Sequence, residues 1–130
     1  MGLDISIDTK ENGVYVVFPK GEINTQTHQI LEDRLKDIVA KARAIMFEMG
    51  GVSYISSMGL SAIFRIKLAM EERGGTIALV NMQPQVQLVF DTMKILSPQM
   101  FASLTEADDY LDKFLNGVQD GTIKPREPLE

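Results

Sequence analysis

The chain begins with a strict alternation of apolar and polar residues, which is typical of a strand with one buried face. This alternation covers residues 3–7. Asn12-Gly13 follows, and this dipeptide is the strongest short signal for a hairpin turn. A second apolar run covers residues 14–18. The pattern therefore predicts two antiparallel strands joined by a tight turn, with a connection over residues 21–27.

Downstream, short apolar runs alternate with segments of helical periodicity. The runs at residues 44–49 and 76–81 are typical of strands buried on both faces of a parallel sheet. Apolar residues recur three and four positions apart over residues 27–43, 60–73 and 84–94, which predicts three amphipathic helices. A strand–helix–strand order implies parallel pairing with right-handed crossovers.

The C-terminal part contains a last pair of elements and then changes character. We expect a short strand over residues 99–102 and a final helix that Thr105 caps. From Gly117 onward the chain is rich in glycine and proline and poor in apolar residues. The sequence predicts one α/β domain over residues 1–116, with a mostly parallel mixed sheet, an N-terminal antiparallel hairpin and about four helices, followed by a flexible tail over residues 117–130.

Composition excludes several classes of function. The 130 residues suffice for one core, and the net charge of −5 argues against nucleic acid or an anionic membrane as a partner. There is no cysteine and only one histidine, His28, so thiolate chemistry and a three-histidine metal site are excluded. No apolar run approaches the roughly 18 residues of a membrane span, and no basic-then-apolar signal region opens the chain. We expect a cytoplasmic protein without metal, cofactor or enzymatic activity, because no nucleophile–base–acid set is evident.

The segment Tyr54 to Leu60, YISSMGL, joins a predicted strand to a predicted helix and carries the candidate chemistry. Either Ser56 or Ser57 can cap the helix by accepting hydrogen bonds from its first N–H groups. Gly59 permits a close approach of backbones or an unusual backbone angle. The alternative to a plain cap is a regulatory phosphate on Ser57, because a helix N-terminus favours negative charge.

Other residues are expected to flank the same surface, since loops at the carboxyl ends of parallel strands meet at one edge. Asn24 is a candidate contact, and it is also one of three candidate N-caps, with Thr25 and Thr27, of the helix predicted over residues 27–43. Met58 is a candidate exposed contact or a partly buried residue beneath the loop, and Met82 extends the surface or fills a loop. The complete predicted partner-binding set is Ile23, Asn24, Ser56, Ser57, Met58, Gly59 and Met82.

Four stretches together resemble one known family. They are KGEINTQT, GVSYISSMGL, ERGGTIALVN and PQVQLVFDTM. Their order resembles the STAS domain of bacterial anti-sigma factor antagonists, over about residues 3–115. Three positions depart from the family pattern: Ser56 replaces a common acidic residue, Met58 a small residue and Asn24 an aspartate.

The resemblance implies a partner-switching protein. The family's phosphorylated serine lies two residues before the loop glycine, which is Ser57 here, and Ser56 is the second candidate. Unphosphorylated, such a protein binds an anti-sigma factor with serine kinase activity; phosphorylated, it releases it, and a serine phosphatase restores it. The kinase binds the ATP, so no cofactor is implied for this chain. The alternative is an unphosphorylated scaffold or small-ligand-binding module within a larger sensory or transport assembly, and a homodimer stays open.

Overall fold

Six strands form one mixed sheet in the computed structural model, which describes residues 2–93 and 99–101. The sheet order is β1-β2-β3-β5-β6, and β4 pairs with β2 beyond the end of β3. In chain order the elements are β1 (Leu3–Thr9), the 3-10 turn η1 (Glu11–Gly13), β2 (Val14–Ile23), α1 (His28–Val39), β3 (Ala44–Glu48), β4 (Val52–Ile55), α2 (Ser57–Glu72), β5 (Thr76–Val80), α3 (Pro84–Met93) and β6 (Gln99–Phe101).

The opening hairpin is confirmed. β1 and β2 are antiparallel, with a register that runs from Leu3 opposite Gly21 to Thr9 opposite Tyr15. Asn12 and Gly13 both have positive φ angles, of 63° and 76°. The Lys10 N–H donates to the Val14 carbonyl at 2.8 Å, which closes the three-residue turn η1, and asparagine and glycine adopt positive φ angles at lower cost than other residues.

β2 is longer than its apolar run predicts, because two different strands pair with it. Its first part pairs with β3 in parallel, and residues 21–23 pair with β4. The prediction of a connection over residues 21–27 is therefore wrong for its first three residues. The segment between the strand predicted over residues 44–49 and the helix predicted over residues 60–73 likewise contains a strand, β4. The end of β2 and the whole of β4 form strands because they pair with each other across about 30 residues of sequence. A local sequence pattern does not indicate such a pairing.

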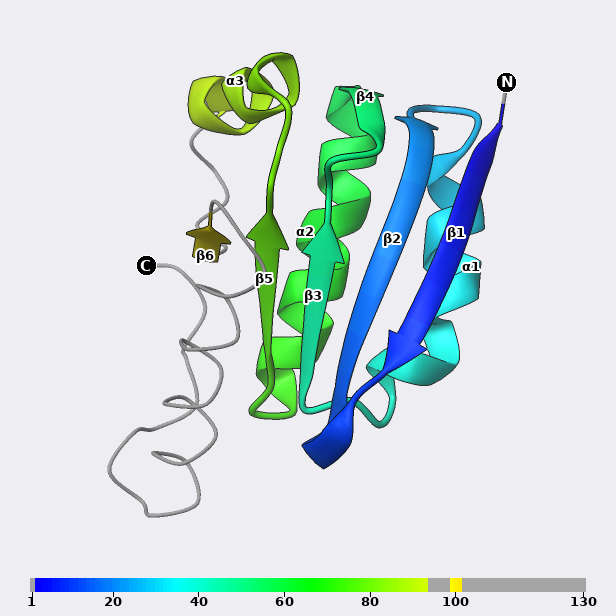
Figure 1. The fold of residues 1–130 in the computed structure, drawn as a ribbon, viewed down its shortest axis with the longest axis vertical. Helices are drawn as coiled ribbons and strands as arrows, with labels where there is room; N and C mark the ends of the chain where they lie inside the picture. The colour runs from blue at the N-terminus through cyan, green and yellow to red at the C-terminus, as the bar shows by residue number, and fades with distance from the viewer. Residues whose placement is uncertain (1, 94–98, 102–130) are drawn as a thin grey trace.

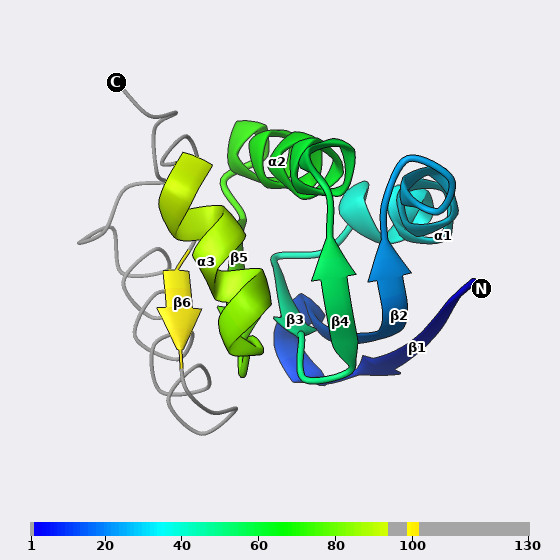
Figure 2. The same ribbon diagram turned by 90° about the horizontal axis from the view of Figure 1, so that it is seen from above.

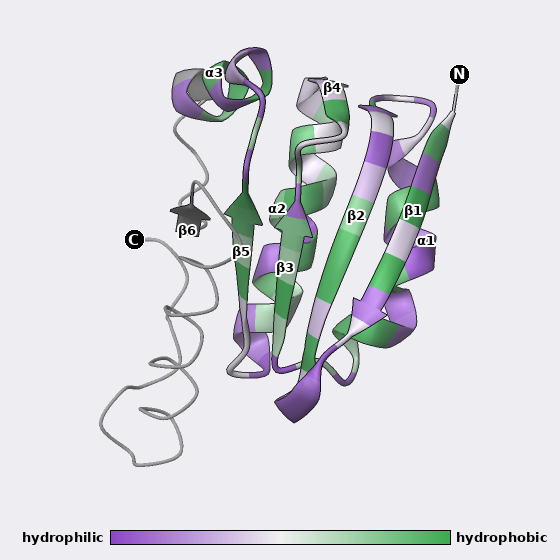
Figure 3. Ribbon diagram, viewed as in Figure 1, coloured by the Kyte–Doolittle hydropathy of each residue, from purple (hydrophilic) through white to green (hydrophobic). Residues whose placement is uncertain are grey.

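α1 and α2 lie side by side on one face of the sheet, behind it in Figure 1 and above it in Figure 2. Between the sheet and these helices lies the main apolar core, in which Val17, Phe47, Leu31, Leu35 and Ile63 are fully buried. Each such side chain contributes about 1.5–3 kcal/mol relative to exposure. The apolar colouring of β3 and β5 in Figure 3 reflects strands buried throughout, apart from half-buried Glu48.

α1 ends at Val39, four residues before the predicted end at residue 43. The chain must turn there to enter β3, and the Arg43 N–H donates to the Gly13 carbonyl at 2.8 Å. The Arg73 guanidinium donates to the carbonyls of Val39 and Ala42, at 2.9 Å each. A cation at this position satisfies carbonyls that the end of a helix leaves without partners.

A second charged contact joins α1 to α2 at the surface. Arg65 donates to both oxygens of Glu32, at 3.0 and 2.7 Å, and His28 Nδ1 lies 2.8 Å from the same carboxylate. The hydrogen bonds from Arg65 lower the pKa of the Glu32 carboxyl, against the smaller opposing effect of burial. The pair holds the outer faces of the two helices together.

Among the remaining predicted elements, α2 begins at Ser57, three residues before the predicted start at residue 60. β5, α3 and β6 occupy residues 76–80, 84–93 and 99–101, close to their predicted bounds. The predicted final helix and the predicted tail over residues 117–130 lie outside the described residues.

Candidate functional site

Three segments meet at the carboxyl ends of β2, β4 and β5. The Ser56 N–H donates to the Ile23 carbonyl at 2.9 Å, which joins the start of α2 to the end of β2. The side-chain amides of Gln83 and Gln85 donate to the carbonyls of Gly50 and Ser53, at 2.9 Å each. We call the exposed parts of residues 22–27, 50–61 and 81–88 the carboxyl-end surface. It lies at the top of Figure 1, where β4 leads into α2 beside α3.

The two adjacent serines have different structural roles. Ser56 is the N-cap of α2: its backbone is extended, and its hydroxyl oxygen accepts a hydrogen bond from the Gly59 N–H at 3.2 Å. Ser57 is the first residue of the helix and is exposed. No hydrogen bond joins its hydroxyl to any residue that the structure describes. Ser56 is therefore the serine that caps the helix, and Ser57, with its hydroxyl, is exposed to solvent.

Gly59 is required by a close approach between α2 and β2. A Cβ atom at this position would lie 2.3 Å from the Ile23 carbonyl oxygen and 2.8 Å from Ile23 Cγ2. The sequence offered two reasons for a glycine at position 59, a close approach of backbones or an unusual backbone angle. The close approach is the reason, because the φ angle of Gly59 is not positive. The Ile23 side chain is fully buried, so its predicted place among the contact side chains is wrong: it packs beneath the start of α2.

Asn24 organises the turn that leads into α1. Its side-chain oxygen accepts from the N–H groups of Gln26 and Thr27, at 2.9 and 3.1 Å. The Thr27 hydroxyl accepts from the Asn24 N–H at 2.9 Å and donates to the Glu22 carbonyl at 2.7 Å. The formal N-cap of α1 is Thr27, which makes no capping bond with its side chain. Asn24 thus performs the capping role one turn earlier, and it is half-buried.

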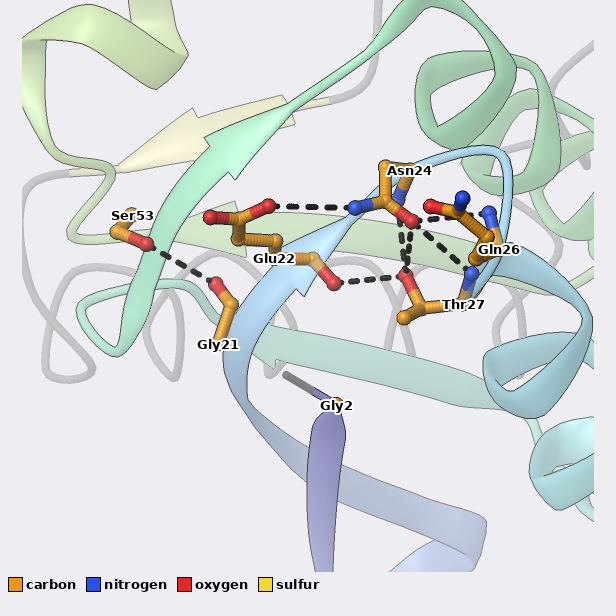
Figure 4. Close-up of a pocket in the computed structure, with 7 residues that line it drawn as sticks. All are labelled: Gly2, Gly21, Glu22, Asn24, Gln26, Thr27 and Ser53. Atoms are coloured by element: carbon orange, nitrogen blue, oxygen red, sulfur yellow. Dashed lines mark hydrogen bonds between the residues drawn. The ribbon is translucent and has the colours of Figure 1, made fainter.

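A cavity of about 620 Å³ opens beside this turn (Figure 4). It lies between the end of β2, the start of β4 and Gly2, which precedes β1. Its lining consists of Gly2, Gly21, Glu22, Asn24, Gln26, Thr27 and Ser53. None of these residues has an apolar side chain large enough to hold an apolar ligand.

Exposed apolar side chains lie on the same surface. Met58 is 41% exposed, which favours the predicted exposed contact over burial beneath the loop. Met82 is half-buried and packs against the core. Sequence reasoning missed Tyr54, at 49% exposure, and Leu88, at 63%. Leu88 lies off the inward apolar stripe of α3, so the helical periodicity could have predicted that its side chain is exposed. Nothing in the pattern around Tyr54 indicates that this aromatic ring faces solvent.

No three side chains of His, Asp or Glu gather to form a metal site within residues 2–93 and 99–101. In the same part of the chain, no helix has the length and apolar content that crossing a membrane requires.

This fold agrees with what comparisons with known proteins show. The family model of the STAS domain matches residues 6–107, and the chain belongs to this family. Among curated relatives, BtrV of Bordetella bronchiseptica, named as a candidate anti-sigma factor antagonist, is 28% identical over 99 residues. This match covers 75% of the present chain and 85% of BtrV.

Solved structures show the same fold at lower identity. A candidate anti-sigma factor antagonist from Thermotoga maritima superimposes with a TM-score of 0.77, at 20% identity over 83% of this chain and 94% of its own. The Bacillus cell fate determinant SpoIIAA in its phosphorylated form gives a TM-score of 0.67 at 17% identity, over 83% and 99% of the two chains. A sulfate transporter family protein from Wolinella succinogenes gives 0.70 at 16% identity, over 84% and 93%.

Proposed function

We propose that this STAS protein is an anti-sigma factor antagonist that switches partners through phosphorylation of Ser57. Unphosphorylated, it binds an anti-sigma factor with serine kinase activity at the carboxyl-end surface, and the bound sigma factor is released. The observation that carries this proposal is the Ser57 hydroxyl, exposed and without a hydrogen-bond partner among the described residues at the first position of α2.

The position of Ser57 suits a phosphate that changes binding without unfolding the domain. The first N–H groups of a helix have no partner within it, and the helix dipole places partial positive charge there. A phosphate adds about −1.5 to −2 charges and three acceptor oxygens at this point. Ser56 keeps its capping bond to the Gly59 N–H, so the start of α2 stays formed.

The chain contributes the acceptor oxygen, and the partner contributes the catalysis. Ser57 Oγ attacks the γ-phosphorus of ATP held by the kinase, the new O–P bond forms, and the bond to ADP breaks. The hydroxyl proton passes to a base of the kinase. A serine phosphatase then hydrolyses the ester and restores the binding form. We therefore propose a non-enzymatic, cytoplasmic protein without a cofactor.

Two of the similar proteins support this role. BtrV is itself named as a candidate anti-sigma factor antagonist, and SpoIIAA is known in both unphosphorylated and phosphorylated forms.

The decisive test uses each purified anti-sigma factor kinase that the source genome encodes, incubated one by one with this protein and ATP. We expect one of them to add a single phosphate that peptide mass spectrometry places on Ser57. Ser57→Ala should abolish the modification, whereas Ser56→Ala, the matched neighbour, should retain it. Phosphate on Ser56 alone, or stable binding that phosphorylation leaves unchanged, would contradict the proposed switch.

The alternative of a ligand-binding module has one observation in its favour, the cavity of about 620 Å³ beside Asn24. Ligand pockets in proteins are mostly apolar with a few polar groups. This cavity has a lining of glycines and polar side chains only, so it favours water over an organic ligand. Thermal-shift screening of small polar metabolites tests it, and a stabilising ligand lost in Asn24→Ala would favour the alternative.

A further inference from the structure

A second hollow, of about 490 Å³, lies on the face of the sheet opposite α1 and α2. Its lining consists of Asp4, Ser6, Phe18, Pro19, Lys20, Glu48 and Gly51. Side chains alternate between the two faces of a strand, and Ile5 and Ile7 pack against the core beneath the helices. Asp4 and Ser6 therefore lie on the other face, which is the one toward the viewer in Figure 1. The hollow faces away from α2, whose first residue is Ser57.

The register of the sheet places charged groups around one aromatic ring. Asp4 of β1 lies directly opposite Lys20 of β2. Phe18, two residues before Lys20, lies on the same face of β2. The next strand, β3, pairs with β2 up to Phe47, so Glu48 lies beside Phe18 on the side away from β1. The hollow therefore has a carboxylate and an ammonium side by side at one end, and a second carboxylate beyond the ring.

The charged groups of the hollow do not pair with one another. No ion pair joins Lys20 to Asp4 or to Glu48 in the part of the chain that the structure describes. Neutral donors hold Glu48 instead, the Gly50 N–H at 3.0 Å and the Asn81 side-chain amide at 2.9 Å. A carboxylate has about four lone-pair sites, so Glu48 keeps the capacity to accept further hydrogen bonds.

These groups match a basic α-amino acid group by group. The α-ammonium and α-carboxylate of such a ligand are adjacent, as Asp4 and Lys20 are across the two strands. Its aliphatic stem lies over the half-buried ring of Phe18, and its side-chain cation reaches Glu48 in a charge-assisted hydrogen bond. The cation is also attracted to the face of the ring. Two carboxylates and one ammonium give the hollow a net negative charge, which the net positive charge of the ligand neutralises.

We propose that this hollow binds a basic α-amino acid, namely lysine, ornithine or arginine. An acidic amino acid would place its side-chain carboxylate against Glu48, and a simple diamine would leave Lys20 without a carboxylate. The cavity beside Asn24 has neither an aromatic ring nor a cationic group in its lining. The inference is independent of the proposed function, because neither Ser57 nor a kinase takes part in this binding.

The test titrates the full ¹⁵N-labelled chain with each amino acid and follows the backbone amides by NMR, at constant ionic strength. At least one of L-lysine, L-ornithine and L-arginine should shift the amides around the hollow, with a Kd of about 1 mM, because exposed charge pairs are weak. Two analogues of lysine serve as matched ligands. Norleucine lacks the side-chain cation and cadaverine lacks the carboxylate, so each should bind at least about threefold more weakly.

Exposed residues of β1 and β2 provide the variants. Asp4→Asn and Lys20→Gln should each weaken binding about three- to fivefold. Asp8→Asn is the matched control, because Asp8 is exposed on the same face of β1 but does not line the hollow. It should change the affinity by less than about twofold. All three positions are exposed, and the dispersion of the same NMR spectra shows that each variant is folded.

The outcomes decide the assignment. Shifts around the hollow that Asp4→Asn and Lys20→Gln weaken, and that Asp8→Asn leaves unchanged, support it. Three results would each overturn it: no shift with any of the three amino acids up to about 20 mM, equal binding of norleucine or cadaverine, or equal weakening by Asp8→Asn. None of these results bears on the phosphorylation test at Ser57, so the two proposals can fail separately.

Discussion

Replacing Gly59 by alanine tests how the start of α2 is held against β2. The added Cβ would lie 2.3 Å from the Ile23 carbonyl oxygen, and ordinary contacts begin about 1 Å further out. Overpacking of this kind costs about 1–3 kcal/mol. Moving the helix away would also lengthen the 2.9 Å hydrogen bond from the Ser56 N–H to the Ile23 carbonyl, which is worth about 1 kcal/mol. Alanine recovers about 1 kcal/mol of helix propensity relative to glycine.

The balance is a net destabilisation of about 1–3 kcal/mol for Gly59→Ala. Urea unfolding followed by far-UV circular dichroism measures this free energy of unfolding. Ser61→Ala is the matched control, because it changes helix propensity two residues later at a half-buried position without a comparable clash. We expect the control to be neutral or slightly stabilising. If Gly59→Ala gained stability as the control does, the close approach would not be what requires glycine.

The other predictions concern single contacts, each measured by the same unfolding assay. Ser56→Ala should cost about 1 kcal/mol through the lost cap, whereas Ser57→Ala should change stability by less than about 0.5 kcal/mol. Since Arg65 lowers the pKa of Glu32 below 4.5, their pair stabilises the fold above that pH and loses its effect as the pH falls through the lowered value. Arg65→Met should therefore remove part of the acid sensitivity between about pH 5 and pH 2, and an unchanged profile would contradict this. Lys67 is buried at 1% exposure with its ammonium 3.0 Å from a buried carboxylate, so Lys67→Met should cost about 3 kcal/mol.

The hairpin and the α/β order could be predicted from the sequence because they depend on neighbours along the chain. Asn12-Gly13 specifies its turn through the φ angles that these two residues tolerate. The runs that became β3 and β5 are buried almost throughout, and continuous apolar character is enough to indicate such strands.

The division of roles between Ser56 and Ser57 could not be predicted in the same way. Either serine can cap a helix, and the local sequence is compatible with both. The choice follows from the hydrogen bond between the Ser56 N–H and the Ile23 carbonyl, which fixes where the helix begins. That bond exists because β4 pairs with the end of β2, so one long-range pairing decides which hydroxyl faces solvent.

By itself, then, the sequence determined the elements other than β4 and the end of β2, together with the turn and a loop with two serines before a glycine, since periodicity and backbone preference are local properties. Only the tertiary structure decided that Ile23 lies inside and Tyr54 and Leu88 outside, and that three segments from distant parts of the chain meet in the carboxyl-end surface. The physical reason is that burial and hydrogen bonding at this surface depend on which strands lie side by side, and strand pairing is a property of the whole fold.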